Sequence, residues 1–154
     1  MISRGAMPGA LKHMRLRAGE HQATFAVPPA RAGQFASALL GGGAGAAGAR
    51  LVVDAVVFPP RHLRTALGHG EEDGWLDAET VVEADAGEAA SLLTAALQDW
   101  TDFWFVPIPG GFLLYGDHDE YSTVFGHRRG AVSRVAEALH AAGFDEIDGY
   151  EREL

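Results

Sequence analysis

The sequence contains no cysteine and a single lysine, Lys12. The absence of cysteine excludes disulfide bonds, thiolate metal ligands and cysteine nucleophiles from this chain. The 12 basic residues are outnumbered by 21 acidic residues, which gives a net charge of −9 at pH 7. Because binding to a phosphate backbone needs clustered Lys and Arg, we do not expect nucleic acid as a direct partner.

Long hydrophobic runs are also missing. Asp54 interrupts the run from Leu51 to Pro60, and prolines and glycines interrupt the run from Phe103 to Tyr115. A membrane-spanning helix needs about 20 consecutive apolar residues, so we expect no membrane segment. The first residues include Arg4 but no apolar stretch typical of a signal peptide, and we therefore expect a cytoplasmic protein.

No diagnostic catalytic motif is present. The chain lacks Gly-x-Ser-x-Gly, a phosphate-binding P-loop and a dinucleotide fingerprint placed after a strand. Its glycine-rich stretch, residues 41–48, follows a predicted helix, which is the wrong context for a nucleotide-binding loop. We therefore expect no cofactor, and the sequence leans towards a protein that is not an enzyme.

The sequence has enough apolar material for one folded domain. Its 154 residues are 47% hydrophobic and 21% charged, which is typical of a globular protein. Residues 1–14 mix Gly, Pro, Ala and isolated charges without a period, so we expect a flexible arm or an expression remnant there. Residues 15–154 are predicted to form the domain.

Hydrophobic periodicity predicts six strands and four helices in the order β-α-β-α-β-α-β-β-β-α. The predicted strands cover residues 21–27, 51–58, 79–84, 102–108, 112–115 and 120–125. Three predicted helices cover residues 30–40, 62–67 and 128–142. The fourth begins near Glu88, after a cap at Asp85, and carries its apolar stripe to Trp100.

The last three predicted strands follow one another through short connections, which indicates an antiparallel meander. We therefore predict an α+β fold in which helices pack on a single mixed, largely antiparallel sheet. An α/β open sheet with parallel strands is the alternative. Four aromatic residues fit the buried positions of the pattern: Trp100, Phe103, Trp104 and Phe105.

Charge is divided unevenly along the chain. Residues 1–70 carry 8 basic and 2 acidic groups, a net +6, whereas residues 71–154 carry 4 basic and 19 acidic groups, a net −15. This asymmetry fits complementary faces within one fold, a homo-oligomer joined head to tail, an acidic surface that binds a basic partner, or a solvated acidic surface.

A tryptophan lies within a strongly acidic loop. Trp75 has carboxylates on both sides, at Glu71, Glu72, Asp73 and Asp77. Tryptophan is enriched at interface hot spots and a ring of carboxylates steers a basic partner, so these are candidate binding residues. A tryptophan that folds back onto its own domain is the alternative. The leading hypothesis is a small acidic protein-binding module, such as an inhibitor, an immunity-type protein or a regulatory partner.

The stretch Tyr115–Tyr121 (YGDHDEY) places four ionisable residues in a row between two apolar segments. His118 and Glu120, with the following His127, resemble a metal set of two histidines and one carboxylate. A hairpin turn explains the same stretch more simply, because Gly and Asp suit tight turns. We favour the hairpin and expect no metal.

The stretch Gly126–Gly130 (GHRRG) lies where the last predicted helix begins. The free N–H groups and positive dipole of a helix start favour an anion, and Arg128 and Arg129 add bidentate donors. These two are candidate binding residues. Pairing of the arginines with the acidic residues of the YGDHDEY stretch is the alternative.

A third candidate joins Asp54 to His62. Asp54 lies in a strand that is predicted to be covered on both faces, where a charge is costly unless it is paired. Asp54 with Arg61 or His62 would form a catalytic dyad. A structural pair, or an exposed strand face at Asp54, is the favoured alternative. With the metal and anion candidates, the dyad defines the alternative function: a small metal- or anion-dependent enzyme or ligand-binding protein with a His/carboxylate pocket.

Overall fold

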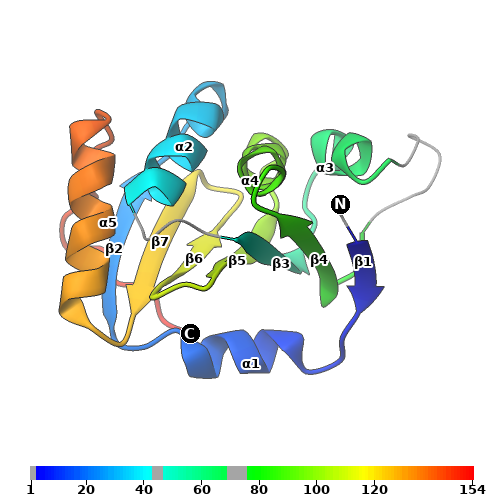
Figure 1. Cartoon of the computed structure of the whole chain (residues 1–154), viewed down its shortest axis with the longest axis horizontal. Helices are drawn as coiled ribbons and strands as arrows, with labels where there is room; N and C mark the ends of the chain where they lie inside the picture. The colour runs from blue at the N-terminus through cyan, green and yellow to red at the C-terminus, as the bar shows by residue number, and fades with distance from the viewer. Residues whose placement is uncertain (1–2, 43–46, 69–75) are drawn as a thin grey trace.

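A computed structural model of the chain describes residues 3–42, 47–68 and 76–154 (Figure 1). In these residues seven strands form one sheet, and five α-helices pack on it. The strands are β1 (Ser3–Ala6), β2 (His21–Ala26), β3 (Gly48–Ala55), β4 (Thr80–Asp85), β5 (Asp102–Ile108), β6 (Leu113–Gly116) and β7 (Tyr121–Gly126). The helices are α1 (Ala10–Arg17), α2 (Ala32–Gly42), α3 (Arg61–Ala66), α4 (Ala89–Gln98) and α5 (Arg129–Ala141), with a short 3-10 helix (Pro29–Arg31) before α2.

The strands are arranged in the order β1-β4-β3-β5-β6-β7-β2. Every pairing between the described strands is antiparallel. This confirms the predicted α+β fold, with β5, β6 and β7 as the meander, and excludes the parallel open sheet. All the predicted strands and helices occur. β5 has the predicted bounds, and the other elements are shifted by a few residues.

Residues 3–17 add a strand and a helix that the hydrophobic pattern does not predict. β1 pairs with β4 along its whole length, although its sequence, SRGA, has no alternation of apolar residues. α1 buries Ala10 and Met14 and leaves most of its other side chains exposed. A flexible arm or an expression remnant is expected over residues 1–14, and the structure places β1 and the first part of α1 within residues 3–14. Backbone pairing and two buried side chains hold this segment, and neither produces a hydrophobic period.

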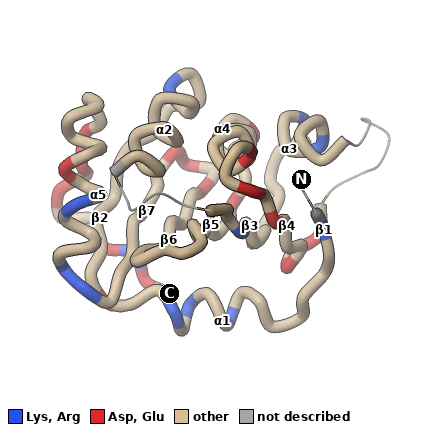
Figure 2. Tube along the Cα trace, in the orientation of Figure 1, with Lys and Arg blue, Asp and Glu red and all other residues tan. Residues whose placement is uncertain are grey.

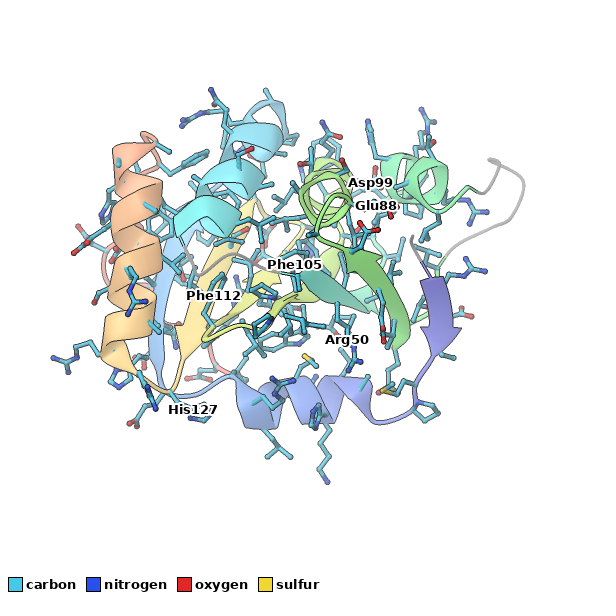
Figure 3. All side chains as sticks on the ribbon, viewed as in Figure 1. Arg50, Glu88, Asp99, Phe105, Phe112 and His127 are labelled. Carbon is cyan, nitrogen blue, oxygen red and sulfur yellow. The ribbon has the colours of Figure 1, made fainter. Side chains whose placement is uncertain are left out.

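Apolar side chains fill both faces of the sheet. The larger core lies between the sheet and helices α2, α4 and α5, and a smaller core lies between the sheet and α1 (Figure 1). Strand β5 shows the alternation, since Phe103 and Phe105 enter the larger core whereas Trp104 and Val106 enter the smaller one. Phe105 and Phe112 point into the layer between the sheet and the helices (Figure 3). The core positions predicted for Phe103, Trp104 and Phe105 are therefore confirmed.

Helix α5 ends in a Schellman motif. Gly143 adopts a φ of 89° and donates its N–H to the carbonyl of His140 (3.0 Å). The N–H of Phe144 donates to the carbonyl of Leu139 (3.0 Å), which completes the pair of hydrogen bonds typical of this motif. The motif turns the chain sharply back towards the sheet.

The C-terminal tail then runs along β2. The N–H of Ala26 donates to the backbone carbonyl of Asp145 (3.3 Å), and the N–H of Ile147 donates to the backbone carbonyl of Thr24 (2.8 Å). These bonds cover the outer edge of a strand that would otherwise present unpaired backbone groups. They also bring Arg152, near the end of the chain, over the face of the sheet.

Candidate functional site

The turn between β6 and β7 is held by one carboxylate, that of Asp117. Its Oδ1 accepts the backbone N–H groups of Asp119 (2.8 Å) and Tyr121 (3.1 Å). Its Oδ2 accepts a hydrogen bond from Nη2 of Arg152 (2.9 Å), and both of these charged side chains are only 12% exposed. The YGDHDEY stretch is therefore the hairpin connection that its residues predict.

Arg152 occupies the position beside the acidic turn that one alternative gave to Arg128 or Arg129. Its Nε donates to Oγ1 of Thr123 (2.9 Å), and its guanidinium lies 4.7 Å from the centre of the Tyr115 ring. Arg128 and Arg129 follow β7, and the six residues of that strand separate them from the turn. The pairing between these two arginines and the turn is therefore not formed.

The carboxylate of Asp54 accepts a hydrogen bond from the hydroxyl of Tyr115. Burial raises the pKa of Tyr115, and the hydrogen bond to Asp54 raises it further, so the phenol stays protonated. In the described part of the chain, no hydrogen bond or ion pair joins Asp54 to Arg61 or His62.

His62 pairs instead with Asp99, at the end of α4. The Asp99 carboxylate accepts the backbone N–H groups of His62 (3.0 Å) and Leu63 (2.8 Å), and it lies 2.7 Å from Nδ1 of His62. Asp99 is 4% exposed and satisfies the first N–H groups of α3. The structure does not bring the candidate residues Asp54 and His62 together, and it forms two separate pairs, Asp54 with Tyr115 and His62 with Asp99.

His118 pairs with Asp102. Its Nδ1 and its backbone N–H lie 2.9 and 2.8 Å from Oδ1 of Asp102. The hydrogen bond to Asp102, followed by the charges of nearby carboxylates, raises the pKa of His118. No group of three or more His, Asp and Glu residues among those described is placed to hold a metal ion. The candidate ligands His118, Glu120 and His127 do not come together, because β7 lies between the first two and the third.

Three large apolar side chains are exposed beyond the end of β3 and of α4. These residues, Val57, Phe58 and Trp100, are 42%, 45% and 37% exposed, and we refer to the two aromatic ones, Phe58 and Trp100, as the aromatic patch. The rings of Phe58 and Trp100 lie 5.7 Å apart at an angle of 58°. The prediction that Trp100 is a core residue is wrong, because α4 ends at Gln98 and Trp100 has a φ of 52° that takes it off the helical stripe.

Carboxylates border the aromatic patch. The indole N–H of Trp100 donates to Oε2 of Glu120 (3.0 Å). Glu120 has a φ of 67°, so both partners of this hydrogen bond adopt left-handed backbone conformations. The neighbouring Asp119 has a side chain that is 77% exposed. Left-handed conformations of non-glycine residues are uncommon and cluster at binding and active sites.

A cavity of about 590 Å³ lies near the opposite end of β7. We refer to it as the basic cavity, because its polar lining consists of Arg17, His127, Arg128 and Arg134, with backbone from Gly110, Gly111 and Gly126. None of the described Asp and Glu residues lines it. Figure 2 shows basic segments at the beginning of α5 and along α1, and Figure 3 shows His127 at the beginning of α5.

No family model, curated protein or solved structure matches this chain. Across the described residues, no helix has the length and apolar character needed to cross a membrane.

The candidate binding residues of the acidic loop are described only in part. Asp77 is exposed. Four others lie outside the described residues: Glu71, Glu72, Asp73 and Trp75. Among the described residues, Trp100 is an aromatic that is exposed beside carboxylates, although the helical pattern predicted it in the core.

The basic cavity contains part of the predicted anion site. Arg128 lines it, whereas Arg129 does not. Arg134 also lines the cavity, but it is not among the residues predicted from the sequence. It lies four residues after Gly130 and so on the same face of α5, and this spacing could have indicated it. Arg17 lies more than 100 residues away in the chain, and no local pattern connects it to α5.

Proposed function

We propose that this protein binds another protein through the aromatic patch, and that the neighbouring carboxylates select a basic partner. The observation that carries the proposal is the pair of Phe58 and Trp100, whose rings are in contact while both side chains remain exposed. Apolar area left in water costs roughly 25 cal/mol per Å². Tryptophan is also enriched among the residues that dominate binding energy. Burial against a partner would offset the cost of this exposure.

The geometry of the patch favours a preformed binding surface. Trp100 is fixed on one side by the Phe58 ring and on the other by the hydrogen bond to Glu120. The left-handed conformations of Trp100 and Glu120 cost on the order of 1–3 kcal/mol each, and such strain is retained chiefly where it serves function. A ring that is already fixed loses less conformational entropy when a partner binds.

The charges near the patch favour a cationic partner. Glu120 contacts Trp100, and the neighbouring Asp119 is highly exposed. We infer a partner that places an apolar side chain on the aromatic pair and Lys or Arg beside these carboxylates. Attraction of this kind speeds encounter and weakens with salt. An inhibitor, an immunity-type protein or a regulatory subunit acting in the cytoplasm would fit this role.

The test is capture from the native host's lysate by four immobilised forms of the protein: wild type, Phe58→Ala, Glu120→Gln and Leu16→Ala. Leu16 is 71% exposed on α1, so it is a matched control for the loss of an exposed apolar side chain. We expect one protein to be captured by the wild type and by Leu16→Ala. Capture should be lost with Phe58→Ala, weakened with Glu120→Gln and reduced at high salt.

The affinity of each variant for the purified partner then measures how much the substituted side chain contributes to binding. Loss of a hot-spot side chain costs about 2 kcal/mol or more, which is at least a roughly 30-fold loss of affinity. Equal capture by Phe58→Ala and Leu16→Ala would contradict the proposal. The partner could also be a second copy of this chain. Sedimentation of the pure protein identifies that case, because the wild type would then be a dimer and Phe58→Ala would dissociate it.

A further inference from the structure

The basic cavity collects unpaired positive charge in a chain whose net charge is negative. Arg17 lies at the end of α1, Arg128 immediately precedes α5, and Arg134 lies in the helix. Within the described residues, none of these three side chains has a hydrogen-bond or ion-pair partner, although the chain carries 21 acidic groups. All three are exposed, and arginines that line one cavity give it a positive potential that favours an anion.

Close backbone packing sets the position of Arg17 in the cavity. Gly19 follows α1 with a φ of 84°, and a Cβ built on it would lie 2.5 Å from the carbonyl carbon of Gly126 and 2.6 Å from the backbone nitrogen of His127. Only glycine allows this approach. The end of α1 is thereby held against the end of β7, where α5 begins. The three arginines therefore line one cavity because of the fold and not because of their order in the sequence.

The size and polarity of the cavity suit a small molecule. Its volume of about 590 Å³ lies within the range of roughly 300–1,000 Å³ that is typical of ligand sites. A second cavity of about 250 Å³ shares Arg17 and Gly110 with it and is otherwise lined by Arg50 and by residues at the end of β5, Val106, Pro107, Ile108 and Pro109. Each of the two volumes therefore combines arginine with apolar residues.

Backbone donors add to the arginines of the basic cavity. Gly130 and Ala131, in the first turn of α5, line the basic cavity. The first turn contains no acidic residue, and Arg128 at the N-cap makes no capping hydrogen bond with its side chain. The N–H groups at the start of a helix have no intrahelical acceptor, so they are available to an oxyanion that the arginines hold.

We propose that the basic cavity binds a small molecule that carries a phosphate or pyrophosphate group. Three guanidinium groups match an anion of charge −2 or more, and their planar donors suit phosphoryl oxygens. The cavity leaves room for a larger group attached to the phosphate. This site is separate from the aromatic patch, which lies near the other end of β7, and it does not depend on the proposed protein partner.

The test is calorimetric titration of the full chain at low ionic strength with inorganic phosphate, pyrophosphate and citrate. We expect saturable binding of one pyrophosphate, tighter than that of citrate. Arg17→Gln and Arg134→Gln should each weaken pyrophosphate binding about 10-fold or more, because each removes a charged hydrogen-bond donor from the lining of the cavity. Arg129→Gln removes the same charge from an exposed residue outside the lining and should change the affinity less than about 2-fold.

Three results would overturn the assignment: no saturable binding of phosphate or pyrophosphate, equal weakening by Arg129→Gln and Arg134→Gln, or citrate binding as tight as pyrophosphate binding. Amide spectra check that each variant is folded, and pyrophosphate should shift the signals of Gly110, Gly126 and Gly130. Phe58→Ala should leave pyrophosphate affinity unchanged. The pyrophosphate titration therefore tests the basic cavity alone, and the capture experiment tests the aromatic patch alone.

Discussion

Asp117 combines two roles at the β6–β7 turn: it accepts two backbone N–H groups, and it pairs with Arg152. Two substitutions separate these roles. Asp117→Asn keeps an oxygen for the backbone and loses the charge, whereas Asp117→Ala loses both. We expect Asp117→Ala to lower the free energy of unfolding by about 1–3 kcal/mol, and Asp117→Asn to lower it by about 1 kcal/mol or less. Urea denaturation measures both, and equal losses would show that the turn does not need the oxygen.

The pair of His118 and Asp102 predicts a pH dependence. The pKa of His118 is raised in the folded protein, chiefly by the hydrogen bond to Asp102. A raised histidine pKa means that the folded state binds the proton more tightly than the unfolded state does. Its stabilisation is therefore fully present below the unfolded value of about 6.5 and is lost as the pH rises through the folded pKa.

An NMR titration of the His118 ring tests this prediction. The folded wild type should titrate above about 6.5, and Asp102→Asn should return the pKa towards that value. The amide introduced by Asp102→Asn still offers an oxygen to the backbone N–H of His118, so the substitution isolates the charge. The stability gap between the two proteins should be larger at pH 5.5 than at pH 8.5. A gap that does not change with pH would contradict this interpretation.

At the scale of elements, strands and helices were predicted correctly where apolar residues follow a regular period. They were missed, or ended at the wrong residue, where backbone pairing or an unusual φ determines the structure. Strand β5 alternates between two cores, and its bounds are as predicted. Strand β1 has no apolar pattern and is held by pairing with β4. Trp100 continues the spacing of the α4 stripe, but the helix ends before it and a left-handed φ exposes the ring. The spacing of apolar residues cannot predict that a tryptophan adopts a left-handed backbone conformation.

Two glycines at the ends of α1 provide a matched test of how that helix is positioned. Gly9 and Gly19 have φ values of 85° and 84°, but a Cβ on Gly9 would meet nothing within 4 Å, whereas one on Gly19 would meet the backbone of Gly126 and His127. Gly9→Ala should lose about 1–2 kcal/mol from the left-handed conformation alone. Gly19→Ala should lose at least a further ~1–3 kcal/mol from overpacking.

Thermal or urea unfolding of the two variants measures the difference. We also expect Gly19→Ala to weaken pyrophosphate binding, because Arg17 would move with the end of α1, and Gly9→Ala to leave that binding unchanged. Equal destabilisation by the two substitutions would contradict this account, because it would show that the backbone at the end of β7 accommodates a methyl group at Gly19 without loss of stability.

At the scale of the whole molecule, the division of charge along the sequence does not become a division in space. Residues 1–70 are net basic and residues 71–154 are net acidic, yet Arg17 from the first part meets Arg128 and Arg134 from the second in one cavity. The aromatic patch likewise joins Phe58 to Trp100. Composition predicts that charge and aromatic residues are available for binding, whereas only the fold determines which of them meet.

Photo-crosslinking at Phe58 tests the central claim most directly. A benzophenone amino acid placed at position 58, and separately at the exposed control position Leu16, is expressed in the native host and irradiated. We predict a discrete crosslinked protein from position 58 that Glu120→Gln diminishes, and no such product from position 16. The absence of a crosslinked product from position 58, or the same product from both positions, would contradict a protein-binding role for the aromatic patch.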